Sequence, residues 1–329
     1  MIIDAHGHIS LCPEVLAYKA QIHASLGNPD VGPPRISDDR LREFGQKHID
    51  LLDAVGTDIQ LLSPRPFHAM HSLRPHKVVV EWTRFVNEII ARTCALFPDR
   101  YIGVGGLPQG TDLPLDTAVA ELDRCINEYG FVGCVINPDP SEGGFPIPPG
   151  LGDPYWFPLY ERLCEHDVPA LVHSASCSSP RESYTLHFIN EESTATVSLL
   201  ESDVFSEYPD LKIYMGHGGG AIPYQIARFE SWRSKKNAEE RFRDSMRRLW
   251  FDTCVYNAEG LDLLFKIVGT DRCAFGTENP GTGTAIDRDT GRQFDDLRPV
   301  IENEIPWLTE QDKKNVFEDV PKALFKLKV

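Results

Sequence analysis

The sequence lacks any apolar run that approaches the ~20 residues needed to cross a bilayer. It also lacks the basic stretch and apolar core of a secretory signal peptide at its N-terminus. We therefore expect no membrane partner and predict a cytoplasmic location. The 8 cysteines include no Cys-x-x-Cys pair, which argues against a zinc ribbon or a thioredoxin-type site, and we expect most of them to be reduced and buried.

Positive charge is also scarce, because 33 Lys and Arg residues stand against 49 Asp and Glu, giving a net charge of -16. Such a chain would be repelled by a nucleic-acid backbone unless one face were strongly basic. The densest basic stretch, residues 241–248, is interleaved with acidic residues and is interpreted as a solvated helical face. We predict no nucleic-acid partner.

Short apolar runs that are typical of buried strands recur along the chain, at residues 2–4, 58–63, 101–107, 132–136, 169–172, 212–215, 249–253 and 273–275. Segments with helical periodicity lie between them, for example 79–96, 115–129 and 262–267. Alternation of this kind predicts parallel βαβ units. Eight units favour a closed (β/α)8 TIM-type barrel, formed by a single domain over residues 1–329. The alternative is a doubly wound open sheet, which the lack of a G-x-G-x-x-G turn after any strand argues against.

Two long segments interrupt this regular pattern. Residues 12–46 follow the first predicted strand, and the Pro- and Gly-rich residues 138–154 follow the fourth. Loops of this length in a compact domain usually form lids or interfaces, so we predict long inserted loops after strands 1 and 4. A last helix is predicted to begin at Thr309, with Asp312 supporting its cap.

Potential metal ligands stand where the predicted strands end. His6 and His8 close the first strand, and they share one face because strand side chains alternate. Chance alone supplies roughly 0.4 such pairs in a chain with 11 histidines, so the pair needs partners. His173 ends the fifth strand and Glu278 follows the eighth. In a barrel these ends meet at one mouth, so we predict a single divalent metal ion, Zn²⁺ in the first place, held by His6, His8, His173 and Glu278.

Other polar residues are predicted at the same mouth. His217 ends the sixth strand, where an acid–base or ligand-supporting role is favoured over metal ligation. Arg65 ends the second strand and is a candidate for holding a substrate carboxylate. Asn137 ends the fourth strand and is a further candidate for substrate binding.

With these residues in place, the chain resembles the amidohydrolase superfamily, in the branch related to aminocarboxymuconate semialdehyde decarboxylase. The resemblance rests on His6-x-His8, His173, His217 and an acid after the last strand. Further segments resemble the 4-oxalomesaconate hydratases of that branch, among them Ser63-Pro64-Arg65-Pro66-Phe67, Asn137-Pro138-Asp139-Pro140, the stretch 186–192 and His217-Gly218-Gly219-Gly220. Glu278 supports the hydratases in particular, since the decarboxylases usually carry Asp at that place. The residues 319–322 depart from the superfamily by lacking Asn-Ala before the last helical turn.

The resemblance implies a hydro-lyase that adds water to the C=C bond of 4-oxalomesaconate. The product would be 4-carboxy-4-hydroxy-2-oxoadipate, in the breakdown of gallate and protocatechuate. A bound divalent ion lowers the pKa of a water toward 7, and Glu278 is expected to move the proton. His217 and Tyr184 are the other expected catalytic groups. The small polycarboxylate substrate is expected to contact Arg65, His187, Asn190 and Asn137.

Several alternatives stay open. A metal-dependent decarboxylase of the same branch would release carbon dioxide, and a hydrolase would use the same ligands. A metal-binding scaffold without turnover is disfavoured by a water-accessible metal beside Arg65. A serine esterase is excluded, because no G-x-S-x-G elbow accompanies His217-Gly218-Gly219-Gly220. We expect a homo-oligomer, and the sequence assigns no role to His68, His71 and His76.

Overall fold

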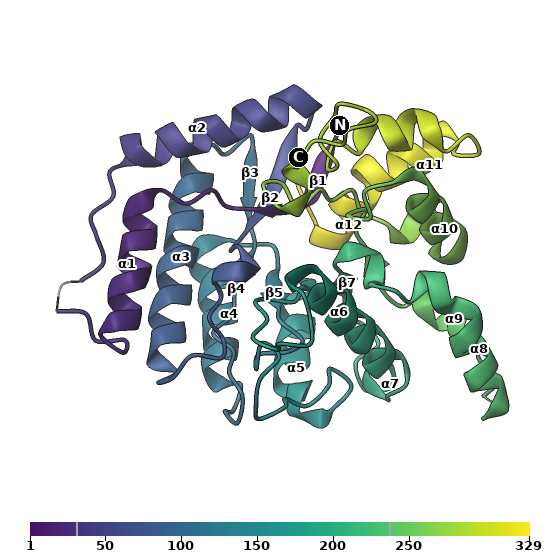
Figure 1. Cartoon of the computed structure of the whole chain (residues 1–329), viewed down its shortest axis with the longest axis horizontal. Helices are drawn as coiled ribbons and strands as arrows, with labels where there is room; N and C mark the ends of the chain where they lie inside the picture. Colours follow the sequence, from purple (N-terminus) through teal and green to yellow (C-terminus); the bar gives the residue numbers. More distant parts are fainter. Residues whose placement is uncertain (31, 237) are drawn as a thin grey trace.

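The computed structural model describes residues 1–30, 32–236 and 238–329. Short strands alternate with helices along the chain, and every ladder between named strands is parallel (Figure 1). The strands are β1 (Ile3–His8), β2 (Ile59–Ser63), β3 (Tyr101–Gly103), β4 (Gly105–Gly106), β5 (Cys134–Ile136), β6 (Ala170–Val172), β7 (Ile213–Met215) and β8 (Trp250–Phe251). The α/β class predicted from the sequence is therefore confirmed.

The strands form two ladders, β1-β2-β3 and β4-β5-β6-β7-β8, which meet on both sides. On one side Val104 separates β3 from β4, and its N–H donates to the carbonyl of Leu62 over 2.8 Å. On the other side residues 273–275 take the place of the last barrel strand. There the N–H of Ala274 donates to Phe251 O over 2.9 Å, and the N–H of Ala5 donates to Phe275 O over 2.7 Å. These bonds connect the two ladders into the barrel arrangement.

Side chains fill the space that the strands enclose. Most strands contribute one or two buried apolar residues to a single cluster, made of Ile3, Ala5, Leu61, Val104, Val135, Leu171, Tyr214 and Ala274. Helix α12 (Val320–Phe325) adds Val320, Leu324 and Phe325 to the same cluster. The barrel interior is thus a packed core, closed by the last helix, and the functional groups are left to the carboxyl ends of the strands.

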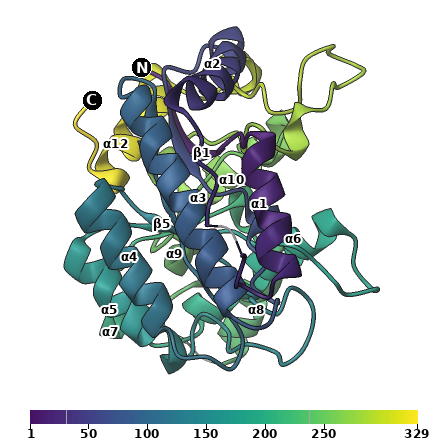
Figure 2. The same ribbon diagram turned by 90° about the vertical axis from the view of Figure 1, so that its left-hand side faces the viewer.

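Helices surround the strands. Figure 1 shows α1, α3 and α4 on one side and α10 and α11 on the other, and in Figures 1 and 2 the two chain termini lie near one another. The other helices are α1 (Pro13–Ala24), α2 (Asp38–Val55), α3 (Lys77–Leu96), α4 (Asp116–Tyr129), α5 (Phe157–His166), α6 (Tyr184–Leu200), α7 (Val204–Glu207), α8 (Ile226–Lys235), α9 (Phe242–Met246), α10 (Ala258–Val268) and α11 (Glu310–Lys314). Within the described ranges, no helix is both long enough and apolar enough to cross a membrane.

The structure differs from the sequence predictions at the segment after the first strand. Residues 12–46 are not one long loop, because they hold α1 and the first half of α2. Pro13 starts α1 at a position that needs no N–H donor, and the helix buries Val15, Tyr18 and Ile22. The ring of Tyr18 packs edge-on against Phe85 of α3, with centroids 4.8 Å apart.

Two other local predictions agree with the structure. Residues 138–153 contain no helix or strand, as expected for the inserted loop after the fourth predicted strand. Helix α11 begins after Thr309 with a reciprocal cap, in which Thr309 and Asp312 each accept from the other's backbone N–H. All 8 cysteines are free.

Candidate metal centre

Strand β1 carries two histidines into the barrel mouth with a glycine between them. His6 and His8 are each 1% exposed. Gly7 lies against the buried side chain of Gln60, where an added Cβ would come within 2.1 Å of Gln60 Cδ. Gln60 is fixed in turn, because its amide donates to Asp4 Oδ2 over 2.8 Å and to Asn279 O over 2.9 Å. A side chain at position 7 would therefore displace β1 and the two histidines that it carries.

Three imidazoles converge on one point with their Nε2 atoms unpartnered. Ligand atoms of His6, His8 and His173 lie within 4.8 Å of one another. Among the described residues, none of these three Nε2 atoms has a hydrogen-bond partner, and all three are buried. Buried polar atoms without partners are costly unless a ligand satisfies them. Three imidazole nitrogens aimed at one point are a donor set for a divalent transition-metal ion, so these residues fit the metal predicted from the sequence.

The opposite ring nitrogen of each histidine is held by a neighbouring oxygen. His6 Nδ1 lies 2.6 Å from Asp252 Oδ2, His8 Nδ1 lies 2.9 Å from Ser63 Oγ, and His173 Nδ1 lies 2.6 Å from Ser174 O. A bond at Nδ1 fixes both the ring orientation and the tautomer, which leaves the Nε2 lone pair free for a metal. Burial lowers the pKa of His6, against the opposing influence of Asp252, and lowers that of His8 further. Both rings are therefore neutral, the form that binds metals.

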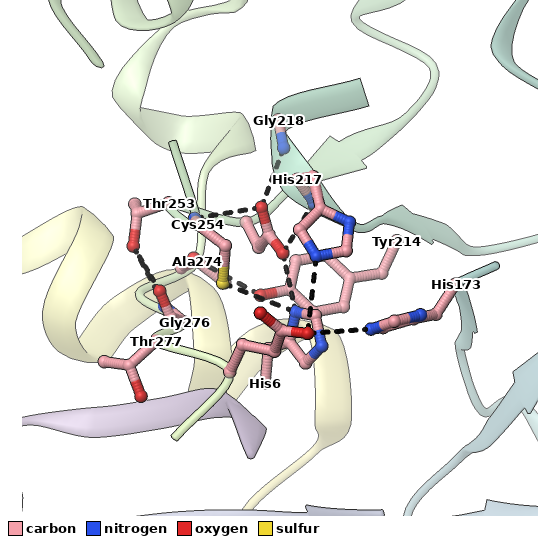
Figure 3. A network of polar contacts seen from close by, with 12 residues as sticks. His6, His173, Tyr214, His217, Gly218, Thr253, Cys254, Ala274, Gly276 and Thr277 are labelled. Carbon is pink, nitrogen blue, oxygen red and sulfur yellow. Dashed lines mark hydrogen bonds and ion pairs between the residues drawn. The ribbon is translucent and has the colours of Figure 1, made fainter. Parts of the chain in front are cut away.

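Asp252 is the anchor of this arrangement. Its carboxylate accepts from the backbone N–H groups of His217 at 2.9 Å, Gly218 at 2.8 Å and Cys254 at 3.1 Å, besides the bond with His6 (Figure 3). Burial would raise the pKa of Asp252, but the hydrogen bond with His6, the charge of His217 and the backbone N–H of Gly218 lower it. Asp252 is therefore ionised, and it joins the end of β7 to the end of β1.

Glu278 faces the same point from the last strand position. Its Oε1 lies 3.7 Å from Nε2 of both His173 and His217, and 4.0 Å from Nε2 of His8. Burial would raise the pKa of Glu278, but the contacts with His173 and His217 lower it well below its ordinary value. Glu278 is therefore an ionised carboxylate that lies near the imidazoles of His8, His173 and His217.

His217 is held differently from the other histidines. Its Nδ1 lies 2.8 Å from Glu192 Oε2, a fully buried carboxylate on α6. Burial would lower the pKa of His217, but the charge and hydrogen bond of Glu192 and the contact with Glu278 raise it well above its ordinary value. His217 thus lies between two carboxylates, a setting that favours its protonated form.

Three non-glycine residues at this site have left-handed backbone conformations. The φ angles are 47° at His217, 67° at Tyr256 and 62° at Glu278. Such conformations cost about 1–3 kcal/mol each and persist where the surrounding structure fixes them. The Tyr256 hydroxyl donates to Glu278 Oε2 over 2.8 Å. The left-handed backbone at Tyr256 and Glu278 therefore places the two side chains that form this bond, and the bond fixes the direction of the carboxylate.

A cavity of about 310 Å³ opens beside these residues. It is lined by His8, Arg65, His173, Tyr184 and Glu278 together with residues 280–282. Arg65 donates to the carbonyl of Pro280, which directs its guanidinium across the mouth toward the last strand end. The ring of Tyr184 packs against Phe67 and Phe188, with centroids 5.7 Å and 4.5 Å away. Arg65 and Tyr184 therefore both line this cavity.

The remaining predicted substrate ligands lie elsewhere around the mouth. Asn137 lines a small neighbouring pocket, where its amide contacts His71 Nδ1 at 3.0 Å and donates to Asp139 O at 2.9 Å. His187 and Asn190 line a separate groove. There His187 Nδ1 lies 2.7 Å from Glu182 Oε2, and Asn190 Nδ2 donates to Glu182 Oε1 over 2.9 Å. Their contact with substrate stays a prediction.

The histidines without an assigned role are now placed. His71 is buried, and its Nε2 lies 3.0 Å from Leu107 O. His68 lies 3.0 Å from Lys19 Nζ, and His76 lies 3.4 Å from Thr117 Oγ1, both half-buried. All three have partners outside the cluster of His6, His8 and His173.

Sequence reasoning missed four supporting residues. Asp252 lies at the end of the seventh predicted strand, residues 249–253, so the strand-end argument that found His173 would also have found it. Tyr256 and Ser63 lie near strand ends but have common side chains without a metal-ligand signature. Glu192 lies on α6, 25 residues before its partner His217, and no local pattern connects the two.

A family comparison agrees with this geometry. The amidohydrolase family model matches residues 3–327, and the chain belongs to the amidohydrolase family.

Three individual proteins are similar to this chain, two of them hydratases and one a decarboxylase that shares the fold. The 2-keto-4-carboxy-3-hexenedioate hydratase of Sphingobium sp. strain SYK-6 is 35% identical over 99% of this chain and 96% of its own. The crystal structure of the 4-oxalomesaconate hydratase LigJ from Rhodopseudomonas palustris is 33% identical, with a TM-score of 0.88 over 99% of this chain and 96% of that one. A dihydroxybenzoic acid decarboxylase from Polaromonas sp. JS666, solved with bound manganese and the inhibitor 2-nitroresorcinol, shares the fold at 23% identity and a TM-score of 0.75, over 100% of this chain and 97% of that one.

Proposed function

We propose that this chain is a metal-dependent hydro-lyase that adds water to the C=C bond of 4-oxalomesaconate, giving 4-carboxy-4-hydroxy-2-oxoadipate. The observation that carries the proposal is Glu278, an ionised carboxylate 3.7 Å from His173 and His217, in a chain that matches two hydratases over nearly its full length. A hydration needs a base that can take a proton from water and an acid beside it, and Glu278 and His217 supply both at one point.

His6, His8 and His173 would hold the metal, with Glu278 as a ligand or close neighbour. When bound, a divalent ion supplies positive charge that acidifies a water molecule and polarises substrate oxygens. We propose Zn²⁺, since three imidazoles and a carboxylate suit it, although the same donors accept the Mn²⁺ found in the Polaromonas relative.

The remaining roles follow from the charge changes of the reaction. The oxygen of water forms a bond to C4, and Glu278 accepts the proton that water loses. Because the double bond joins C4 to C5 and is conjugated with the C6 carboxylate, negative charge develops on the oxygens of that carboxylate, and the protonated His217 is the donor assigned to them. Glu278 then delivers its proton to C5, so that the elements of one water molecule are added across the C4=C5 bond.

Three substrate carboxylates must be held by a protein of net charge -16. A local cation is therefore needed at the cavity, and Arg65 meets this need, because a guanidinium binds a carboxylate through two parallel hydrogen bonds. The Tyr184 hydroxyl, whose pKa burial raises to about 12, stays protonated and is available as a donor. Asn137 and Asn190 remain the other proposed substrate ligands, whereas the carboxylates of Asp139, Glu182 and Glu191 around His187 disfavour a substrate carboxylate there.

The test is turnover of 4-oxalomesaconate by metal-loaded enzyme. Hydration removes the conjugated double bond, so the ultraviolet absorbance should fall while no carbon dioxide appears. The runner-up is a decarboxylase, favoured by the fold shared with the Polaromonas enzyme. Release of carbon dioxide in step with the absorbance change would support that alternative and contradict the hydratase.

A further inference from the structure

A second cluster of potential metal ligands, one histidine and two carboxylates, lies in the groove beside the proposed metal centre. This groove of about 920 Å³ runs between the loop 138–151 and the stretch 179–195. His187 is 1% exposed, and its Nε2 is buried without a hydrogen-bond partner among the described residues. The atom is 3.7 Å from Asp139 Oδ2, beyond the reach of a hydrogen bond. An unpartnered buried nitrogen beside a carboxylate requires an explanation.

Glu191 completes the cluster from the same helix. His187 and Glu191 stand four residues apart on α6, so their side chains share one face of the helix. Ligand atoms of Asp139, His187 and Glu191 all lie within 4.8 Å of one another. Two ligand atoms that each lie about 2.1 Å from one ion are separated by roughly 3–4 Å, so the gap between His187 and Asp139 suits an ion between them.

The other ring nitrogen of His187 is fixed as at the main site. His187 Nδ1 lies 2.7 Å from Glu182 Oε2, which directs Nε2 toward Asp139 and Glu191. The same pattern, a carboxylate at Nδ1 and a free Nε2, holds for His6 with Asp252. A carboxylate that orients a histidine in this way is a common support for a metal ligand.

Charge at the cluster also favours a cation. Asp139, Glu182 and Glu191 surround one imidazole, and within residues 1–30, 32–236 and 238–329 none of them forms an ion pair with a lysine or arginine. A further carboxylate, such as one from the substrate, would meet repulsion here. We propose that Asp139, His187 and Glu191 form a second divalent-cation site, separate from the site of His6, His8 and His173, with Zn²⁺ or Mn²⁺ as its ion.

The experiment counts bound metal by equilibrium dialysis of the full chain against Zn²⁺. Wild-type enzyme should bind two ions per chain, and Glu191→Gln and His187→Asn should each bind one. The variant His8→Ala, which removes a ligand of the other site, should leave the second site filled. Matched controls are His23→Asn and Glu165→Gln, which replace an exposed histidine and a glutamate paired only with Arg162, and they should retain both ions.

Glu191→Gln preserves side-chain shape, and its unfolding temperature in chelator should equal that of the wild type, which separates loss of the ion from loss of the fold. One ion per wild-type chain would overturn the proposal, as would two ions in both groove variants. A higher KM for 4-oxalomesaconate in those variants, with the metal count unchanged, would instead identify His187 as a substrate ligand and also overturn it.

Discussion

Replacement of Asp252 by asparagine should weaken metal binding although Asp252 itself is no ligand. Every partner of this carboxylate is a donor: the backbone N–H groups of His217, Gly218 and Cys254, and the Nδ1–H of His6. An asparagine amide has one accepting oxygen, and its NH₂ group must face at least one of these donors. The ring of His6 then loses the partner that fixes its tautomer.

The expected size follows from these contacts. Loss of a residue that orients a metal-binding histidine costs about 10- to 100-fold in metal affinity, or about 1.4–2.7 kcal/mol. In the metal-free protein, one buried N–H left unpaired should lower the free energy of unfolding by about 1–3 kcal/mol. The two effects are separable, because the second is present without metal.

The assay is a chelator competition for Zn²⁺, with urea unfolding of the metal-free protein measured in parallel. The matched control is Asp123→Asn, which removes a carboxylate 2.7 Å from His166 on the surface, far from any proposed ligand. The control should bind Zn²⁺ as the wild type does. If Asp252→Asn also bound Zn²⁺ with wild-type affinity, the role assigned to Asp252 would be wrong.

Further predictions concern the acid–base and substrate groups. Glu278→Gln should lower kcat by about 10²- to 10⁴-fold while His6, His8 and His173 still bind metal in dialysis, and near wild-type turnover would exclude Glu278 as the proton shuttle. Tyr256→Phe removes a donor to the charged form of Glu278, so the pKa of Glu278 should rise and the acidic limb of the kcat/KM profile should move to higher pH; an unmoved limb would contradict this. Arg65→Lys keeps the charge but loses the paired geometry, so KM should rise more than kcat falls, whereas an unchanged KM would place the carboxylates elsewhere. Removal of metal with a chelator should abolish turnover and Zn²⁺ should restore it, and a fully active metal-free enzyme would refute the mechanism.

The strand ends were predictable because the barrel geometry sends them all to one mouth. His6, His8, His173 and Glu278 follow apolar runs directly, so a periodicity argument suffices to bring them together, and the structure places them within contact distance of one point. The break of the third predicted strand at Val104 was not predicted, although Gly103, Gly105 and Gly106 interrupt its apolar pattern.

Contacts between residues that are far apart in the chain could not be predicted from local sequence patterns. The bond of Glu192 to His217 depends on how α6 packs beside β7, and the position of His187 depends on the loop after β5. Both are set by tertiary packing rather than by local pattern. Tyr184 lines the cavity beside the metal ligands, whereas His187 and Asn190 line the separate groove, and no local pattern predicts that α6 divides its polar residues in this way.

The central claim, a metal-dependent hydration, is tested most directly by turnover of 4-oxalomesaconate in ¹⁸O-labelled water, with the product analysed by mass spectrometry. The account predicts a tricarboxylate product that carries one labelled hydroxyl oxygen, with no carbon dioxide formed. A product that has lost a carboxyl group as carbon dioxide would contradict it.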